Sequence, residues 1–264
     1  MTEIRDRWAL VTGASSGLGA DFARELAARG CRLVLVARRE DRLKQLAEEL
    51  GTRHGAQARV VALDLGTPAG PGELYERMRD EGLAIDVLVN NAGFGIHGRF
   101  LDIPWERERA MLELDVLALV QLTKRFAREM VARGFGHVLQ VASIGAFQPS
   151  PTYATYSAAK SFVASFSEAL AWELRGSGVS VTVISPGVTE TEFLDVAGQR
   201  RTLYQRATMM KSAEVARIGV RAMLRGRTHV VPGLGNTLSA WSMRLVPRRA
   251  QAAIAGLAMT VGSR

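Results

Sequence analysis

The chain has 264 residues, of which 47% are hydrophobic and 23% are charged. This length and composition suit one well-packed domain. The formal net charge of +8 raises the question of a nucleic-acid partner, but the arginines are spread along the chain and no DNA-binding motif is present. We therefore predict no nucleic-acid partner.

The only cysteine is Cys31, so the chain can form no internal disulfide. Residues 1–7 are polar and charged where a secretory signal would be apolar. Both features favour a cytoplasmic location.

Seven short aliphatic runs alternate with longer segments that suit helices. The runs are Trp8–Val11, Leu33–Val36, Val60–Leu63, Val87–Val89, Val138–Val141, Val179–Ile184 and His229–Val231. Continuous apolar runs of this length are typical of parallel strands that are buried on both faces. The pattern predicts one α/β domain over residues 1–264, with a doubly wound parallel sheet of about seven strands flanked by helices.

Apolar residues at helical spacing predict four helices between these strands. They cover Leu18–Arg29, Asp41–Leu50, Trp105–Ala132 and Tyr156–Leu174, with Gly30 and Gly51 as helix stops. The last two helices carry apolar residues beyond one face, at Leu117, Leu119, Phe162 and Phe166. We expect a homodimer or homotetramer to form through them.

A glycine-rich turn follows the first predicted strand. Its residues include Gly13, Ser15, Ser16, Gly17, Leu18 and Gly19. Glycine lets the backbone approach a pyrophosphate closely, and the N-terminus of the next helix offers free N–H groups and a partial positive charge. An ordinary loop is the alternative, but the position after the first strand of a βαβ series favours a dinucleotide site.

The second predicted strand is followed by two arginines. Proteins that select NAD usually place an acidic residue here, which binds the ribose 2′-hydroxyl. This chain has Ala37, then Arg38 and Arg39. An arginine can pair with the 2′-phosphate of NADP, so we predict NADP(H), with Arg38 as the first candidate and Arg39 as the second. The alternative is that both arginines only cover the start of the next helix and pair with Glu40 and Asp41.

Further motifs follow in order along the chain. They are Asn90-Asn91-Ala92-Gly93 after the fourth strand, Ser143 after the fifth, Tyr156-x-x-x-Lys160 in the next helix, and Pro186-Gly187 after the sixth strand. Together with the Gly-x-x-x-Gly-x-Gly spacing of the first turn, they resemble the short-chain dehydrogenase/reductase family from residue 8 to about residue 193. The resemblance implies a Rossmann-type fold and an oxidoreductase that acts on a ketone or a secondary alcohol.

The resemblance also implies which residues border the cofactor. Asp64 and Leu65 would border the adenine, while Asn90, Ala92 and Gly93 would support the adenosine side and the sheet edge. Near the nicotinamide and the pyrophosphate it places Pro186, Gly187, Thr189 and Thr191. For the Asn90 to Gly93 segment, a turn that merely ends a strand is the alternative.

Tyr156 and Lys160 are four residues apart, so on a helix they share a face. A nearby ammonium lowers the pKa of a phenol from its usual value of about 10, which would let Tyr156 exchange a proton near neutral pH. In the family the lysine also holds the nicotinamide ribose, so both residues would border the cofactor. Ser143 would stabilise charge on the substrate oxygen, and a serine that caps a turn is the alternative. A non-catalytic NADP-binding sensor could lack one of these three residues, but all are present.

Asp115 stands where the family usually has an asparagine that holds a water linked to the lysine. Its backbone carbonyl could still bind that water, but its carboxylate would pair with Lys160. The alternative is a polar helix position with no role in the site.

His97 lies in a loop beside the expected site, but no second histidine or acidic cluster accompanies it at metal-ligand spacing, so we predict no metal.

The loops expected around the nicotinamide are apolar and carry few charges. They contain Phe94, Ile96, Ile144, Ala146, Phe147, Phe193 and Leu194. This favours an apolar or bulky carbonyl substrate, although ordinary packing beneath a loop is the alternative. Residues 190–206 are expected to form a movable lid.

The C-terminal segment Leu234–Thr260 is apolar but interrupted by Arg244, Arg248 and Arg249, so it is not expected to span a membrane. We expect residues 232–264 to form a helical extension that packs over the substrate pocket or against a partner subunit. A helix that lies on a membrane surface is the less favoured alternative.

Overall fold

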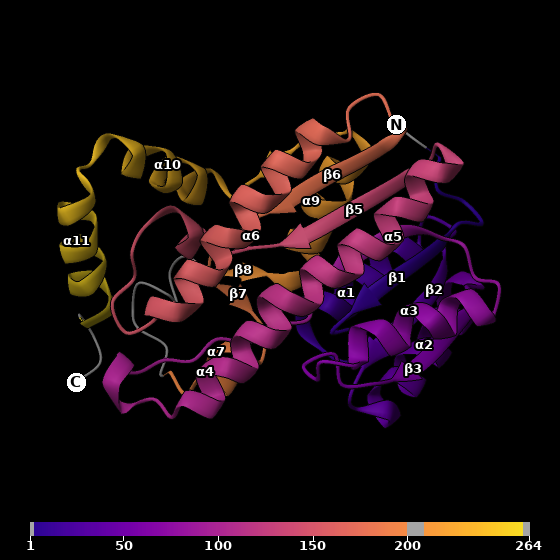
Figure 1. Cartoon of the computed structure of the whole chain (residues 1–264), viewed down its shortest axis with the longest axis horizontal. Coiled ribbons are helices and arrows are strands. Elements are labelled where there is room, and N and C mark those ends of the chain that lie inside the picture. The colour runs from indigo at the N-terminus through magenta and orange to yellow at the C-terminus, as the bar shows by residue number, and fades with distance from the viewer. Residues whose placement is uncertain (1–2, 200–208, 261–264) are drawn as a thin grey trace.

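The computed structural model describes residues 3–199 and 209–260. Its centre is a parallel sheet with the strand order β3-β2-β1-β4-β5-β6-β9 (Figure 1). The strands are β1 (Trp8–Thr12), β2 (Arg32–Ala37), β3 (Ala58–Ala62), β4 (Ile85–Asn90), β5 (Gly136–Val141), β6 (Val179–Ile184) and β9 (His229–Val230). All seven predicted strands and the doubly wound sheet are confirmed, and the strand bounds differ from the prediction by at most two residues.

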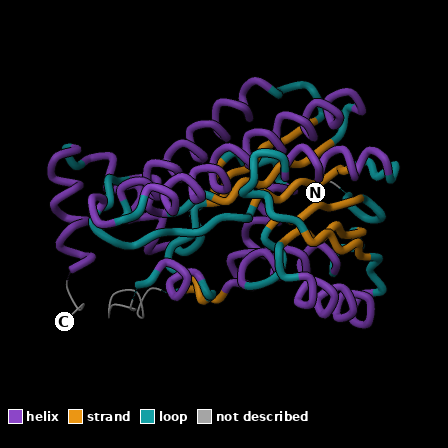
Figure 2. The backbone as a smooth tube through the Cα atoms, turned by 60° about the horizontal axis from the view of Figure 1, so that its bottom comes forward, coloured by secondary structure: helices purple, strands orange, loops and turns teal. Residues whose placement is uncertain are grey.

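Helices cover both faces of this sheet (Figures 1 and 2). One face is covered by α1 (Gly17–Ala27), α2 (Glu40–His54) and α9 (Ser212–Leu224), and the other by α3 (Gly70–Asp80), α5 (Leu119–Arg133) and α6 (Ala154–Glu173). Phe22 and Leu43 are fully buried in the first layer, and Leu74 and Val163 in the second. The two cores follow from continuous apolar strands, which need cover on both faces.

The order of the strands reverses between β1 and β4, and in doubly wound sheets ligands bind in the crevice at such a point. Hydrogen bonds hold the two strand ends together here. The side-chain amide of Asn91 donates to the Thr12 carbonyl at 2.9 Å, and Thr12 Oγ1 accepts from the backbone N–H groups of Asn91 and Ala92, each at 2.9 Å. The crevice is therefore fixed on both sides.

The predicted stop of the second helix at Gly51 is wrong. The helix α2 continues to His54, and the next residue, Gly55, takes the left-handed conformation with φ of +63°. Glycine adopts this conformation without the steric cost of a Cβ, which is why it ends helices. Gly30, just after α1, has φ of +82° and is a helix stop as predicted.

The predicted helix Trp105–Ala132 is present but not uniform. It consists of α4 (Trp105–Leu112), the π-helical turn η2 (Glu113–Ala118) and α5. Single π-helical turns inside α-helices are frequent at functional sites. This one contains Asp115, whose side chain is fully buried.

The remaining elements lie beyond the carboxyl ends of the strands. They are η1 (Phe100–Asp102), η3 (Ile144–Phe147), β7 (Thr189–Glu190), α7 (Phe193–Ala197), β8 (Met210–Lys211), α10 (Leu234–Ser242), η4 (Met243–Leu245) and α11 (Arg248–Thr260). The predicted lid begins at β7 and α7, but its residues 200–206 lie outside the described residues. Helices α10 and α11 project from one end of the molecule (Figure 1). Within the described ranges, no helix is long and apolar enough to cross a bilayer.

Candidate active site

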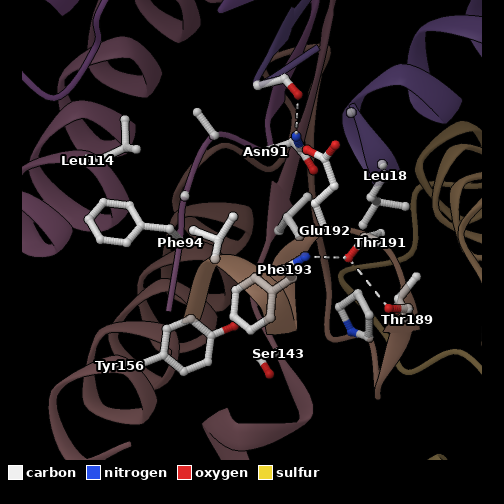
Figure 3. Close-up of a pocket in the computed structure, with 18 of the residues that line it drawn as sticks. Leu18, Asn91, Phe94, Leu114, Ser143, Tyr156, Thr189, Thr191, Glu192 and Phe193 are labelled. Atoms are coloured by element: carbon white, nitrogen blue, oxygen red, sulfur yellow. Dashed lines mark hydrogen bonds between the residues drawn. The ribbon is translucent and has the colours of Figure 1, made fainter. Parts of the chain in front are cut away.

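A cavity of about 680 Å³ lies at the carboxyl ends of the strands, and Figure 3 shows part of its lining. Most of the predicted site residues line it: Gly13, Ser15, Ser16, Gly17, Leu18, Gly19, Arg38, Arg39, Asp64, Leu65, Ala92, Gly93, Ser143, Tyr156, Lys160, Pro186, Gly187, Thr189 and Thr191. Two predicted residues, Asn90 and Asp115, do not line the cavity and act from behind its wall.

Asn90 supports the sheet edge. Its amide donates to Thr123 Oγ1 at 2.9 Å and to Gln140 Oε1 at 3.0 Å, which joins β4 to α5 and β5. Successive residues of a strand point to opposite faces. Asn91, which sequence analysis did not assign to the site, lines the cavity instead. The pair Asn90-Asn91 was the signal in the sequence, but it did not show which of the two side chains faces the cavity.

The glycine turn lines the cavity, is tightly packed, and can offer backbone donors to a ligand. A Cβ on Gly19 would lie 2.2 Å from the Gly13 carbonyl oxygen, and Gly13 itself has φ of +67°, so neither position suits another residue. Ser16 is the N-cap of α1 but forms no side-chain capping hydrogen bond. The first amides of α1 are therefore not capped by that side chain, and this cradle fits the pyrophosphate of a dinucleotide.

Arginine side chains hold a carboxylate at one end of the cavity. Arg39 donates to Ser15 Oγ at 3.1 Å, to Ser16 Oγ at 2.6 Å and to Glu192 Oε2 at 3.0 Å. Arg42, which sequence analysis did not single out, donates to Glu192 Oε1 at 2.7 Å. Hydrogen bonds from Arg42 and Arg39 lower the pKa of Glu192 to about 2. This end of the cavity is therefore a binding place for an anion.

Arg38 is less constrained than Arg39. Its side chain is 75% exposed, and its Nη1 lies 3.8 Å from Asp64 Oδ2. An exposed pair at this distance contributes little to stability, so the Arg38 guanidinium can turn toward a ligand at small cost.

The segment after β6 closes over both ends of the cavity. Thr191 packs against Gly17, where an added Cβ would meet Thr191 Cγ2 at 2.9 Å. The ring of Phe193 lies 5.4 Å from the ring of Tyr156, measured between centroids (Figure 3). Glu192 lies between Thr191 and Phe193 in the chain. Three consecutive side chains therefore contact, in order, the glycine turn, the arginines and Tyr156.

Tyr156, Lys160 and Ser143 come together as the spacing predicted. Tyr156 lies in the first turn of α6, and Lys160 Nζ, one turn later, lies 5.7 Å from the centroid of the Tyr156 ring. Ser143 follows β5 and caps η3, where its Oγ accepts from the Gly145 N–H at 3.1 Å. Ser143 also forms a hydrogen bond with Tyr156.

Behind Tyr156, Lys160 and Asp115 form a buried ion pair. Their Nζ and Oδ2 atoms are 2.9 Å apart, with side-chain exposures of 6% and 0%. Lys160 also donates to the Val141 carbonyl at 3.2 Å, and Asp115 Oδ1 accepts from the Phe94 N–H at 3.0 Å. Burial raises the pKa of Asp115 although Lys160 opposes this. For Lys160, burial alone would lower the pKa, but the charge of Asp115 and the neighbouring Tyr156 keep it above its ordinary value.

The pKa of Tyr156 is raised, which differs from the sequence-based expectation. Burial is the largest cause, and the negative charge of Asp115 adds to it. Lys160 and the hydrogen bond with Ser143 lower the pKa, so the lysine acts in the predicted direction but does not dominate. Tyr156 therefore keeps its proton at neutral pH when neither cofactor nor substrate is bound.

Tyr153 borders the same cluster but has no lysine partner of its own. Its hydroxyl donates to Gln199 Oε1 at 2.6 Å, and burial raises its pKa. Its ring lies 5.7 Å from the ring of Tyr156 and 5.3 Å from that of His97. Burial lowers the pKa of His97. Tyr153 and His97 therefore form an aromatic wall beside Tyr156.

The apolar lining is partly as predicted. Phe94, Ile144, Phe193 and Leu194 line the cavity, joined by Leu114, Val188 and Val196. Three predicted residues do not line it, because Ile96 is buried, Ala146 faces elsewhere and Phe147 stacks on the ring of His229. Within the described residues, no group of three His, Cys, Asp or Glu side chains could hold a metal ion.

Comparison with known proteins identifies the family. The family model for short chain dehydrogenase matches residues 7–202. A very-long-chain 3-oxoacyl-CoA reductase of Pyricularia oryzae is 39% identical over 182 residues, which cover 67% of this chain and 54% of that protein. A solved structure of a 7beta-hydroxysteroid dehydrogenase has a TM-score of 0.87 at 26% identity, covering 97% of this chain and 99% of the other. A short-chain dehydrogenase from Sphingobium yanoikuyae, solved with NADPH, has a TM-score of 0.81 at 32% identity, covering 93% and 98%.

The chain therefore belongs to the short-chain dehydrogenase/reductase family and is an oxidoreductase of that family. Solved structures similar to it contain NADPH, NADP or NAD.

Proposed function

We propose that this chain interconverts a ketone and a secondary alcohol with NADP(H), and that its substrate is apolar. The observation that carries the proposal is the position of Tyr156, beside Ser143 and Lys160 and in the same cavity as the glycine turn. The nicotinamide ring, when bound, supplies the hydride in reduction and accepts it in oxidation.

Tyr156 is the proposed proton donor in reduction. Because burial and Asp115 keep its pKa above the ordinary value, its hydroxyl is protonated at neutral pH and can donate to the substrate oxygen as negative charge develops there. Ser143 Oγ accepts from the Gly145 N–H, and its O–H, which interacts with Tyr156 in the chain without substrate, would donate to the same substrate oxygen once substrate is bound. In oxidation Tyr156 must first lose its proton, which the ammonium of Lys160 favours.

Replacement of Tyr156 by phenylalanine tests the proton donor. Tyr156→Phe should lower kcat by about 100-fold or more, with the NADPH dissociation constant nearly unchanged, because only the hydroxyl is removed. The measurements are NADPH consumption with an apolar ketone and a fluorescence titration of NADPH. Tyr153→Phe is the matched control, since it removes only the hydrogen bond to Gln199, and it should keep most of kcat. A Tyr156→Phe enzyme with more than about a tenth of wild-type kcat would contradict the assignment.

The charge of Asp115 should set the pH dependence of oxidation. Asp115→Asn removes a negative charge that raises the pKa of Tyr156, while its amide oxygen can still face Lys160. The pKa of Tyr156 should fall. Because oxidation requires loss of this proton, the rising limb of kcat/KM against pH should move to lower pH.

The matched control is Asp80→Asn, since Asp80 is an exposed aspartate at the end of α3, and it should leave the profile unchanged. Thermal unfolding of Asp115→Asn shows whether the variant is folded. A rising limb that stays in place or moves to higher pH would show that Asp115 does not act on Tyr156.

The preference for NADP(H) is supported by the arginines beside the glycine turn. The end of β2 has no acidic residue, and Arg38 and Arg39 follow it directly. The carboxylate of Glu192 already bridges Arg39 and Arg42. The 2′-phosphate of NADP offers the same kind of oxygen acceptor with more negative charge, and we infer that it takes the place of Glu192 there.

Cofactor selection should depend on these charges. Wild type should prefer NADPH over NADH in kcat/KM by about tenfold or more, since one or two charge-assisted hydrogen bonds suffice for this. Arg38→Ala/Arg39→Ala should remove the preference, and the single variants show which arginine contributes more. Equal wild-type values, or an unchanged preference in the double variant, would defeat the proposal.

A fluorescence titration of NADPH tests whether the Glu192 carboxylate competes with the 2′-phosphate for the arginines. Glu192→Gln should tighten NADPH binding by about tenfold and change NADH binding less, because the variant no longer opposes the phosphate. Glu190→Gln, an exposed glutamate of the same segment, is the control. Weaker or unchanged NADPH binding by Glu192→Gln would mean that the carboxylate does not occupy the phosphate position.

An apolar substrate is supported by Phe94, Ile144, Phe193 and Leu194, which line the cavity near Tyr156. Two of the similar proteins are named for substrates with a large apolar part, a 7beta-hydroxysteroid and a very-long-chain 3-oxoacyl-CoA. This part of the proposal is tested by a screen that compares steroid, polycyclic and long-chain ketones with small polar ketones. The rate of NADPH consumption is measured with each ketone.

A homo-oligomer through the two long helical segments, α4–η2–α5 and α6, is also part of the proposal. Leu117 on η2 is 55% exposed and Phe162 on α6 is 44% exposed. Of the other two apolar residues that the sequence named on these helices, Leu119 is 4% exposed and cannot contribute to a contact, whereas Phe166 is partly buried and stacks on Phe162.

Light scattering at micromolar concentration checks the assembly. Wild type should have the mass of a dimer or tetramer, and Leu117→Glu/Phe162→Glu should lower it, because two charges would be buried at the contact. Leu238→Glu, an exposed leucine on α10, is the control and should keep the wild-type mass. A monomeric wild type rules the proposal out.

A further inference from the structure

Helix α10 presents large apolar side chains to solvent. Its inward face carries Asn236 and Ala240, which are buried. Its outward face and the following η4 carry Leu234, Leu238, Trp241 and Leu245, which are 92%, 67%, 58% and 72% exposed. The spacing of four, three and four residues keeps them on one side of a helical segment. We call these four residues the apolar stripe.

The stripe is part of a defined structure. Gln251 on α11 donates to the carbonyls of Met243 and Val246, both at 2.7 Å, which ties α11 to η4. Asn236 donates to the Pro232 carbonyl at 2.9 Å and packs against Gly187 of the cavity lining. The extension therefore packs on the domain through small and polar residues, while the four residues of the stripe are exposed within the part of the chain that the structure describes.

The part of the sequence that contains the stripe carries charges of one sign. Residues 215–264 contain no aspartate or glutamate. Arg244, Arg248 and Arg249 lie within and just after the stripe. An amphipathic helix with large apolar residues, a tryptophan and nearby arginines suits the boundary between the headgroups and acyl chains of an anionic bilayer.

Helix α10 lies next to the lining of the cavity, because its Asn236 packs against Gly187. Helices α10 and α11 project beyond the carboxyl ends of the strands in both views (Figures 1 and 2). The turn η1, which precedes α4, also exposes apolar side chains, with Phe100 at 59% and Leu101 at 90%. Exposed apolar surface of this extent marks an interaction site more often than chance exposure.

We propose that the apolar stripe binds an anionic lipid surface, with α10 lying along the plane of the interface. A second copy of the chain suits the stripe less well, because a two-fold contact would bring the same arginine-bearing segment against itself. The alternative of packing over the pocket, which the sequence favoured, leaves these four side chains unexplained. The proposal does not depend on the reaction that the enzyme catalyses.

Cosedimentation of the full chain with vesicles tests the proposal. Wild type should pellet with phosphatidylcholine vesicles that contain phosphatidylglycerol, and less with phosphatidylcholine alone, because the arginines add electrostatic attraction. Added salt should weaken binding to the anionic vesicles. Leu238→Glu/Trp241→Glu should bind at least about tenfold more weakly, since two apolar side chains would no longer enter the bilayer.

A matched control distinguishes binding through the stripe from non-specific binding through any exposed apolar side chain. Trp172 on α6 is 67% exposed, near the end of α6 that lies away from α10 (Figure 1). Trp172→Glu should keep vesicle binding, and all variants should keep the wild-type melting temperature because the changed side chains are exposed.

Three results would overturn the proposal. They are no binding of wild type to anionic vesicles at low salt, equal binding by Leu238→Glu/Trp241→Glu, and a lower mass of this double variant by light scattering without vesicles. The last would show that the stripe is a contact between subunits.

Discussion

The buried ion pair between Asp115 and Lys160 determines how the candidate site is built. It joins the π-helical turn η2 to α6, and its two members also bind the backbone beyond β4 and at the end of β5, at Phe94 and Val141. Removal of water from both charges is costly, so such a pair persists only where geometry and further hydrogen bonds are good. Loss of one partner commonly costs about 3–5 kcal/mol, because the other charge stays buried and unpaired. The position of Lys160, and hence the charge felt by Tyr156, is therefore fixed before any ligand binds.

The segment from Thr191 to Phe193 links the two ends of the cavity. Thr191 contacts the glycine turn, Glu192 binds Arg39 and Arg42, and the Phe193 ring contacts the Tyr156 ring. A ligand that displaced Glu192 from the arginines would pull on a segment whose next residue touches Tyr156. The contacts thus provide a physical route by which the phosphate end of the cavity can affect the end that holds Tyr156, provided that the segment moves as a unit.

The sequence predicted the features that depend on local pattern. Buried parallel strands are continuous apolar runs, and all seven were found from that pattern. The pairing of Tyr156 with Lys160 followed from helical spacing, and Ser143 was added by the resemblance to the short-chain dehydrogenase/reductase family. The bend of the long helix at η2 was not predicted, because a π-helical turn depends on tertiary contacts around Asp115 and leaves no periodic signal in a single sequence.

Long-range contacts explain the other omissions. Glu192 meets Arg39 and Arg42 across about 150 positions of the chain, and spacing alone carries no information on such a contact. The exposure of the stripe on α10 is a similar case, since the pattern of Leu238 and Trp241 shows an apolar face but not whether the domain covers it.

The aspartate at position 115 changes the balance of charge around Tyr156. An asparagine there would leave the ammonium of Lys160 as an unpaired positive charge close to the phenol, which favours the phenolate. With Asp115, the ammonium is paired at 2.9 Å, and the pair has no net charge when both groups are ionised. Burial is the largest influence on Tyr156 and favours the neutral phenol, and it outweighs the opposing effects of Lys160 and Ser143, so the pKa of Tyr156 is raised. We infer that the site is set to donate a proton near neutral pH, which is the step needed for reduction of a carbonyl, and that its use in the oxidative direction requires more alkaline conditions.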